Sequence, residues 1–493
     1  MKKPLNVTIC RLPYNRISGI KKSAYPLWMG YLVGAIRDLL GKQVQLNVVD
    51  GEALDYASDS ILQYNDTINK ALLVFFPRFL LDFDRLAEFA ENEFHPSWTP
   101  FIGRVLENEP DLIAVSCYTN HLLSLQTFAK KIKKESPRTK ILVGGIHPTV
   151  EYMNLVKQIP EIDLCCVGEG ESSFRETVLA FYSGHPGEET PGIFSSQSPA
   201  KFVPRSLVAN IDDIEPPVRD LGSPALYRDE FHIFSSRGCP FKCSFCSSHR
   251  LWTRKPRFHS VERVMSEMTH IVEDLGGFRI IFIDDTFTLN RHRVRKIADA
   301  IIAKGYNKLN IGVCARINTV NESVLDTLAA AGVKSISYGI ETGSERLQRS
   351  IRKNLRRDDI IRILDYTRSL GIHTLSYYIV GHPGESVQDV NDSIELIKTS
   401  RGNKSSVYAA LPLPGTEWFK IASEKGFELS PRLAVTMDQN AFPIFNMTAM
   451  SDKILNEKVL EMYRVANRSS QFGRLQQAVD FYWNKMKMQI RGR

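Results

Sequence analysis

The chain has 493 residues, 43% of them hydrophobic, and a formal net charge of +8 at pH 7. This length exceeds one ordinary domain, so we expect two or three. No run of about 18 apolar residues occurs, which argues against a membrane-spanning helix. No long basic run suggests a nucleic-acid partner. Three of the eight cysteines are clustered and five are scattered, which predicts a reducing, cytoplasmic location and no disulfide framework.

The first 200 residues alternate strand-like and helix-like segments. The short alternating segment behind the charged N-terminus is typical of a first strand and not of a signal peptide. Apolar, β-branched runs predict strands at 7–11, 44–49, 112–116, 140–143 and 163–167, and helical spacing predicts helices at 26–40 and 122–134. This order predicts an α/β fold with a doubly wound, Rossmann-like parallel sheet, whose ligands bind beyond the carboxyl ends of the strands.

Three short elements stand at those strand ends. Ser116-Cys-Tyr-Thr119 follows one strand, Gly144-Gly145 follows the next, and Gly168-Glu169-Gly170 closes another. A glycine pair lets a ligand approach the backbone closely. Each element alone is weak evidence, because a Gly-Gly pair after a strand is usually a tight turn.

The second half of the chain repeats the alternation. Residues 190–230 carry turn and linker chemistry, including Glu215-Pro-Pro. From residue 231, helical segments such as 261–275 and 358–370 separate six predicted strands at 232–236, 279–283, 310–315, 335–340, 374–380 and 405–411. We predict domains at 1–200 and 201–424, followed by a helical C-terminal domain at 425–493.

Three cysteines, Cys239, Cys243 and Cys246, lie in one short segment with the spacing C-x3-C-x2-C. Thiolates are the usual ligands of iron–sulfur clusters, and a fully protein-ligated [4Fe–4S] cluster needs four. With only three, one iron is open to a small molecule. Buried structural cysteines or zinc are the alternatives. His249 leaves a Cys3His zinc set open on composition, although zinc motifs usually pair C-x2-C units.

This cysteine loop, with Phe245 before the third cysteine, resembles the signature of the radical S-adenosylmethionine (SAM) superfamily. The resemblance implies that the three cysteines hold a [4Fe–4S] cluster, and that the amino and carboxylate groups of SAM bind the open iron. Phe245 would lie at the bound cofactor. The six β/α units match the partial (β/α)6 TIM barrel of the superfamily, whose functional residues gather at the carboxyl ends of the strands.

Later strand ends also match the superfamily. Asp284-Asp285 corresponds to the position that holds the amino group of SAM, with capping of the next helix as an equally weighted alternative. Arg316 would pair with the carboxylate or ribose of SAM, or with an acid such as Glu341. Glu341 itself matches the ribose-binding acid, and His382 is interpreted as a plain loop histidine. The remaining implied contacts to the cofactor, near its adenine, are Gly381, Glu385 and Leu411.

The three N-terminal elements, in this order ahead of the cysteine loop, resemble the cobalamin-binding domain of many radical SAM enzymes. Ser116 and Thr119 match its S-x-x-T element, and Gly144-Gly145 matches the glycine pair that lines the slot for the nucleotide tail. Gly168-Glu169-Gly170 matches its G-E-G turn. The motif D-x-H-x-x-G, whose histidine ligates cobalt in many cobalamin proteins, is absent from the chain. The loop with Tyr118, Asn120 and His121 would then face the lower side of the cobalt.

We therefore predict a cobalamin-dependent radical SAM enzyme that methylates an unactivated carbon in natural-product or lipid biosynthesis. Cyclisation, ring contraction, deoxygenation or carbon–carbon coupling remains the alternative chemistry, and a non-catalytic iron–sulfur or cobalamin sensor the alternative class. No catalytic side chain is predicted. Expected partners are a small-molecule or lipid substrate near residues 118–121 and an external electron donor such as flavodoxin or ferredoxin. Residues 481–493 resemble an interfacial helix in composition, but we favour a helix docked on its own domain over membrane-surface contact.

Overall fold

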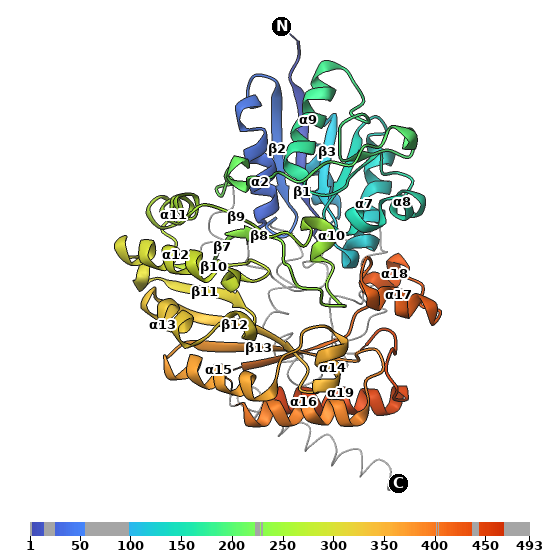
Figure 1. Ribbon diagram of the computed structural model, residues 1–493. Helices are drawn as coiled ribbons and strands as arrows, with labels where there is room; N and C mark the ends of the chain where they lie inside the picture. The colour runs from blue at the N-terminus through green and yellow to red at the C-terminus, as the bar shows by residue number, and fades with distance from the viewer. Residues whose placement is uncertain are drawn as a thin grey trace, which may run out of the picture.

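The computed structural model describes residues 2–13, 25–54, 98–221, 227, 230–400, 402, 404–435 and 443–467. Two six-stranded sheets organise this part of the chain. Figure 1 shows the N-terminal sheet at the top in blue and cyan, and the second sheet below it in yellow and orange.

The N-terminal sheet has the order β2-β1-β3-β4-β5-β6, and all neighbours are parallel except β5 and β6. Its strands are β1 (Leu5–Arg11), β2 (Val44–Asp50), β3 (Leu112–Ser116), β4 (Lys140–Gly144), β5 (Leu164–Cys166) and β6 (Ile193–Phe194). Its helices are α2 (Leu27–Ala35), α6 (Trp98–Leu106), α7 (Leu122–Glu135), α8 (Ile146–Gln158) and α9 (Gly170–Ser183).

Separate apolar cores cover the two faces of this sheet. Trp98, Phe101 and Phe128 belong to the core on one face. Met29 and Phe174, from α2 and α9, belong to the core on the other face. Because helices and apolar side chains cover both faces of the sheet, the predicted doubly wound α/β arrangement is confirmed. Strands buried on both faces are apolar along most of their length, which is the pattern that the prediction used.

The second sheet has the order β14-β13-β12-β11-β10-β7, with every pair parallel. Its strands are β7 (Phe231–Ile233), β10 (Arg279–Phe282), β11 (Asn310–Ala315), β12 (Val333–Glu341), β13 (His373–Val380) and β14 (Lys404–Ala409). The helices between them are α11 (Val261–Thr269), α12 (Arg291–Ala303), α13 (Glu322–Ala330), α14 (Glu345–Ser350), α15 (Arg357–Ser369) and α16 (Val387–Thr399). The sequential strand order and the outer helices confirm the six predicted β/α units (Figure 1).

One strand prediction was too long. The segment predicted at 232–236 leaves the sheet after Ile233, and Ser236–Arg237 forms β8, which pairs antiparallel with β9 (Arg257–Phe258). The buried carboxylate of Asp284 accepts hydrogen bonds from Ser235 and Ser236, which turns the chain away from the sheet.

Polar side chains immediately before several helices fix the loops that lead into these helices. Ser260, Asn290, Asn321 and Ser386 each accept a hydrogen bond from the first turn of α11, α12, α13 and α16. Such caps satisfy backbone donors that the helix itself leaves unpaired. The loops on the functional side of the barrel are thus held at their helical ends.

The C-terminal helices are α17 (Glu417–Glu424), α18 (Pro431–Val435) and α19 (Asp452–Asn467). Leu455, Val459 and Met462 of α19 belong to the barrel core, whereas Ala434 of α18 belongs to the core of the N-terminal sheet. The predicted C-terminal helices are confirmed at these three segments, and residues 481–493 lie outside the described residues. Within the described ranges, no helix combines the length and apolarity needed to cross a membrane.

Candidate functional site

The three cysteines lie on a loop between β8 and α10 (Ser248–Trp252), at the carboxyl ends of the barrel strands. All three thiols are free and partly exposed. The loop begins at Gly238, whose φ is 91°, and a Cβ atom there would lie 2.9 Å from the carbonyl oxygen of Trp252. Only glycine allows this backbone conformation and this close contact, so the glycine sets the path of the loop.

Polar groups of the barrel approach the thiols. Nη1 of Arg316 donates to Sγ of Cys243 at 3.3 Å, and Oγ1 of Thr286 lies 3.9 Å from Sγ of Cys239. Burial raises the pKa of Cys239, and it raises the pKa of Cys246 to about 11. Because a thiolate must form to bind metal, a bound cation has to offset this burial. A loop of three thiols beside a guanidinium and a hydroxyl fits an anionic iron–sulfur cluster.

His249 is turned toward the backbone of the loop. Its Nδ1 lies 3.1 Å from the carbonyl oxygen of Cys246 and can donate a hydrogen bond to that oxygen when Nδ1 carries the proton. Among the residues that the structure describes, no three His, Cys, Asp or Glu groups are arranged to hold a single metal ion.

The acid pair after β10 holds both ends of the cysteine loop. The carboxylate of Asp284 is buried and accepts hydrogen bonds from Ser235 N, Ser235 Oγ and Ser236 Oγ at 2.9, 2.9 and 2.6 Å. Asp285 accepts from Ser248 Oγ at 2.6 Å, directly behind the third cysteine. Neither acid caps the following helix, because Asn290 does so, and the capping alternative is wrong. A contact between this pair and the amino group of SAM stays a prediction.

Glu341 ends β12 in a strained conformation. Its φ is 72°, which is unfavourable for a residue with a side chain, and the register with β13 shifts between Gly339 and Glu341. Such strain collects at functional sites and costs about 1–3 kcal/mol. Oε1 of Glu341 accepts from Nζ of Lys353 at 2.6 Å in a buried ion pair.

Arg316 does not pair with Glu341. Besides Cys243, its guanidinium donates to the carbonyl oxygen of Lys353 and lies 3.9 Å from the ring centroid of Phe241. The buried carboxylate of Glu341 and the guanidinium of Arg316 thus face different partners at neighbouring strand ends. Both stay predicted contacts of SAM.

The loop after β13 is braced by Glu385. Its buried carboxylate accepts from the backbone N–H groups of Gly381 and His382 at 2.5 and 3.2 Å, and it lies 3.1 Å from Nδ1 of His382. His382 is fully buried and packs edge-on against Trp418, with centroids 5.2 Å apart. It is therefore a packed interior residue and not a plain loop histidine.

Phe245 connects the cysteine loop to this region. Its ring lies 5.4 Å from that of Trp418, and the indole of Trp418 donates to Ser244 at 3.1 Å. Leu411 is half-buried in the same apolar cluster. Phe245 and Leu411 thus belong to one apolar cluster, and Phe245 is the neighbour of the third cysteine in the chain.

The predicted elements of the N-terminal sheet are adjacent in space. Ser116 and Gly144 are register partners on β3 and β4. Gly145 has a φ of 107°, and a Cβ atom there would lie 2.9 Å from Ser116 Oγ and 2.9 Å from the Cys117 carbonyl oxygen. Thr119 points inward instead: its hydroxyl lies 3.1 Å from Nδ1 of His147. Burial lowers the pKa of His147 to about 4.

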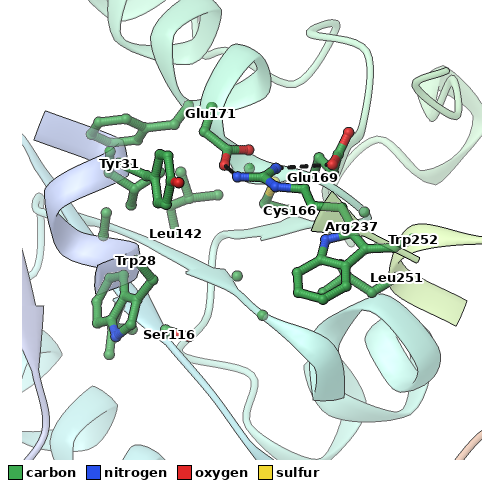
Figure 2. A pocket seen from close by; sticks show the side chains of 18 of the residues that line it. Trp28, Tyr31, Ser116, Leu142, Cys166, Glu169, Glu171, Arg237, Leu251 and Trp252 are labelled. Carbon is green, nitrogen blue, oxygen red and sulfur yellow. Dashed lines mark hydrogen bonds and ion pairs between the residues drawn. The ribbon is translucent and has the colours of Figure 1, made fainter. Parts of the chain in front are cut away.

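A cavity opens at the carboxyl ends of β3, β4 and β5. Its walls come from both domains: Trp28 and Tyr31 belong to α2, whereas Leu251 and Trp252 belong to α10 (Figure 2). The predicted residues that line it are Ser116, Gly144, Gly145, Gly168, Glu169 and Gly170. We call this space the tail cavity.

The carboxylates in the wall of the tail cavity are balanced by Arg237 in the wall and by Arg257, which does not line the cavity. Glu169 accepts from Arg237 at 2.9 Å and from Arg257 at 2.8 Å, and Glu171 accepts from Arg237 at 2.6 Å. Two carboxylates therefore face two guanidinium groups, and the remaining wall is mainly apolar and aromatic. Such a cavity fits the uncharged aromatic base at the end of the cobalamin tail. A contact between Glu169 and cobalamin stays a prediction, since the carboxylate of Glu169 faces Arg237 and Arg257.

A second cavity lies between the two domains. Tyr118, Asn120 and His121 line it from the N-terminal sheet, and His232 and Phe234 line it from the barrel. The residues that it shares with the tail cavity are Trp28, Ser116 and Phe234. We call it the interdomain cavity; the predicted lower-face loop borders it, and Tyr118 keeps 52% of its surface exposed.

Several residues of these sites were not predicted. No sequence motif singles out Arg237 or Arg257. The site was predicted from strand ends, and three of its residues lie elsewhere: Trp28, Trp252 and Lys353. The position of Arg237, immediately before Gly238-Cys239, was the one available signal. The partners of Arg237 are Glu171 and Glu169, which lie 66 and 68 residues away in the sequence. A local sequence pattern therefore could not predict these contacts.

Models of two known families match separate parts of the chain. The B12 binding domain matches residues 88–178, and the Radical SAM superfamily matches residues 233–397. These matches confirm the two predicted domains in their predicted order. The barrel with the cysteine loop and the sheet with the tail cavity are the regions that they cover.

Individual proteins are similar over most of the chain. An uncharacterized methyltransferase of Pyrococcus horikoshii is 29% identical, over 74% of this chain and 80% of its own length. An anaerobic magnesium-protoporphyrin IX monomethyl ester cyclase of Rubrivivax gelatinosus is 24% identical, over 72% of this chain and 65% of its own. The radical SAM methyltransferase TsrM of Kitasatospora setae, solved with cobalamin and a [4Fe–4S] cluster, has a TM-score of 0.64 at 16% identity, covering 95% and 92% of the two chains. That structure shares the fold.

Proposed function

We propose that this chain, a cobalamin-dependent radical SAM enzyme that uses a [4Fe–4S] cluster and SAM, methylates an unactivated carbon of a small-molecule or lipid substrate in natural-product or lipid biosynthesis. The observation that carries the proposal is the adjacency of the two cavities, which share Trp28, Ser116 and Phe234 as lining residues. A group bound in the tail cavity would therefore lie next to the interdomain cavity, which residues of the barrel also line. A methyl donor and a radical site need this proximity.

The cofactors carry the difficult chemistry, and the protein positions them. When bound, the cluster and SAM supply a radical that removes hydrogen from the substrate carbon, and cobalamin supplies the methyl group that takes its place. Cys239, Cys243 and Cys246 would hold the cluster, with Arg316 donating to one sulfur. Glu341 would accept hydrogen bonds from the ribose hydroxyl groups of SAM. Aromatic side chains of the interdomain cavity would limit the access of water to the reacting carbon.

An external electron donor is part of the proposal, because the cluster has to be reduced in each turnover. Lys242, Arg250, Lys255 and Arg352 are exposed on or near the cysteine loop. Such a group of cations favours encounter with an acidic protein of the flavodoxin or ferredoxin kind. No nucleic-acid partner is proposed.

A second candidate keeps the radical and omits the methyl transfer. The similarity to a cyclase supports it, because the same domains then serve ring formation in a related chain. The two candidates differ in their products: methylation releases S-adenosylhomocysteine together with 5′-deoxyadenosine, whereas the other radical outcomes release only 5′-deoxyadenosine.

The deciding experiment is anaerobic reconstitution with iron, sulfide and cobalamin, followed by mass analysis of products from candidate substrates. A product heavier by one methylene unit, with both nucleoside products, supports methylation. Substrate-dependent 5′-deoxyadenosine without S-adenosylhomocysteine would instead favour the second candidate.

A further inference from the structure

The cysteine loop is anchored at both ends on the cobalamin-binding domain. At its start, Arg237 precedes Gly238-Cys239, and its guanidinium donates to Glu169 at 2.9 Å and to Glu171 at 2.6 Å. At its end, α10 packs against α8, the helix that begins immediately after Gly145. Figure 2 shows Arg237 between the two glutamates, beside Trp252 at the wall of the tail cavity.

The contact at Arg237 is buried and leaves few alternatives. The side chain of Arg237 is 4% exposed and that of Glu169 is 5% exposed. Arg257, the register partner of Arg237 across β8 and β9, binds the same carboxylate through two nitrogens at 2.8 Å. Removing one partner from such a cluster leaves a buried charge without compensation, which is strongly unfavourable. The cluster therefore has one stable arrangement, and it fixes the start of the cysteine loop.

The same group of charged side chains forms part of the wall of the tail cavity. Glu169, Glu171 and Arg237 line that cavity together with Leu251 and Trp252 of the barrel domain. A ligand in the tail cavity thus contacts the segments on both sides of the cysteine loop. Conversely, an iron–sulfur cluster that orders the cysteine loop also orders one wall of the tail cavity.

We infer that Glu169 and Arg237 are positioning residues that couple the two cofactor sites, so that cobalamin and the iron–sulfur cluster each increase the affinity of the protein for the other. The inference rests on the proposed use of cobalamin and deepens it. Coupling between sites is reciprocal for binding, and its usual size is a factor of about 5 to 150 in affinity. It needs no contact between the two cofactors, because the shared element is the ordered cysteine loop.

The first test uses the unmodified protein. Affinity for hydroxocobalamin is measured anaerobically by absorbance, with the protein free of cluster and again after reconstitution with iron and sulfide. We expect binding to be tighter by about 5-fold or more in the reconstituted protein. Release of iron to a chelator is expected to slow when hydroxocobalamin saturates the protein. Equal affinities together with equal release rates would overturn the coupling while leaving cobalamin binding intact.

The second test uses Glu169→Gln with Glu176→Gln as the matched control. Glu176 lies on α9, the helix that begins directly after Glu169, and it pairs with Arg205. Its substitution therefore removes a carboxylate without changing the contacts among Glu169, Arg237 and Arg257. In Glu169→Gln, we expect the affinities for hydroxocobalamin with and without the iron–sulfur cluster to differ by no more than about twofold. In Glu176→Gln, we expect the same difference between these affinities as in the wild-type protein. Full dependence in Glu169→Gln would refute the assignment of these residues. A wild-type protein that takes up no hydroxocobalamin in either state would contradict the proposed function itself.

Discussion

The tail cavity and the cysteine loop are built by different physical means. In the tail cavity, glycines with positive φ and a mainly apolar wall define a volume, and the charges in the wall cancel one another. Around the cysteine loop, individual carboxylates and a guanidinium hold specific atoms: Asp284 binds the turn before the loop, Asp285 binds Ser248 behind it, and Arg316 reaches Cys243. Substitutions in the first region should act through volume, and those in the second through lost ligands or lost charges.

The sharpest separation of the regions is expected from Cys243→Ala. Two thiolates cannot hold the three irons that the protein ligates, so cluster binding and all cleavage of SAM should be lost. The wild-type protein should contain about four irons after anaerobic reconstitution. Iron content, visible absorbance and 5′-deoxyadenosine are the measurements.

Cys314→Ala is the matched control for that substitution, because Cys314 lies on β11 outside the cysteine loop. It should retain iron. Production of 5′-deoxyadenosine by Cys243→Ala would show that the ligand assignment is wrong.

Gly145→Leu should have the converse effect, removing cobalamin while the iron content stays at the wild-type level. The backbone at φ 107° disfavours any side chain, and the added atoms would meet Ser116 and Cys117 at the cavity wall. Cobalamin retention after gel filtration is the measurement. Gly103→Ala, in a helix with open space around the added methyl group, should retain cobalamin.

Wild-type binding of cobalamin by Gly145→Leu would mean that the glycine pair does not border the ligand. Electron paramagnetic resonance of the wild-type protein should also show no histidine from a D-x-H-x-x-G motif at cobalt, because that motif is absent.

Glu341→Gln tests a charge in the barrel and should weaken SAM affinity by roughly ten- to a hundred-fold, as loss of a charged hydrogen-bond acceptor costs about 1.5–3 kcal/mol. Iron content should be unchanged. Equilibrium dialysis with labelled SAM measures the affinity. Unchanged affinity combined with a lower melting temperature would assign Glu341 to the buried ion pair with Lys353 alone.

The smallest expected effect is a pH dependence in the N-terminal domain. The pKa of His147 is lowered by burial to about 4, so the unfolded state binds a proton that the folded state refuses. Stability contributed by neutral His147 is therefore present at neutral pH and is lost as the pH falls below the unfolded value of about 6.5. The loss between pH 7 and pH 5.5 should be about 1 kcal/mol.

Urea denaturation at the two pH values measures this loss, and His147→Gln should flatten it in the N-terminal transition. An equal pH dependence in wild type and His147→Gln would assign the titration to other groups.

The sequence alone determined the element types and their order, and it supplied the predicted cluster ligands. Apolar periodicity of 2 or 3.6 is a property of neighbouring residues, so β3, β11 and α7 were predicted to within one residue of their bounds. The spacing of Cys239, Cys243 and Cys246 is equally local, because one short loop carries all three. The conformational demand at Gly145 could also be anticipated, since glycine is the residue that adopts positive φ freely.

Only the tertiary structure decided which charges meet. Nothing near Glu169 in the sequence indicates Arg237 and Arg257, which lie 68 and 88 residues away. The partner of Glu341 is Lys353 and not Arg316, and the carboxylate of Asp284 is taken up by a turn that was predicted as strand. Ion pairs and buried hydrogen bonds depend on the distance between side chains that packing brings together, and a local pattern carries no record of that distance.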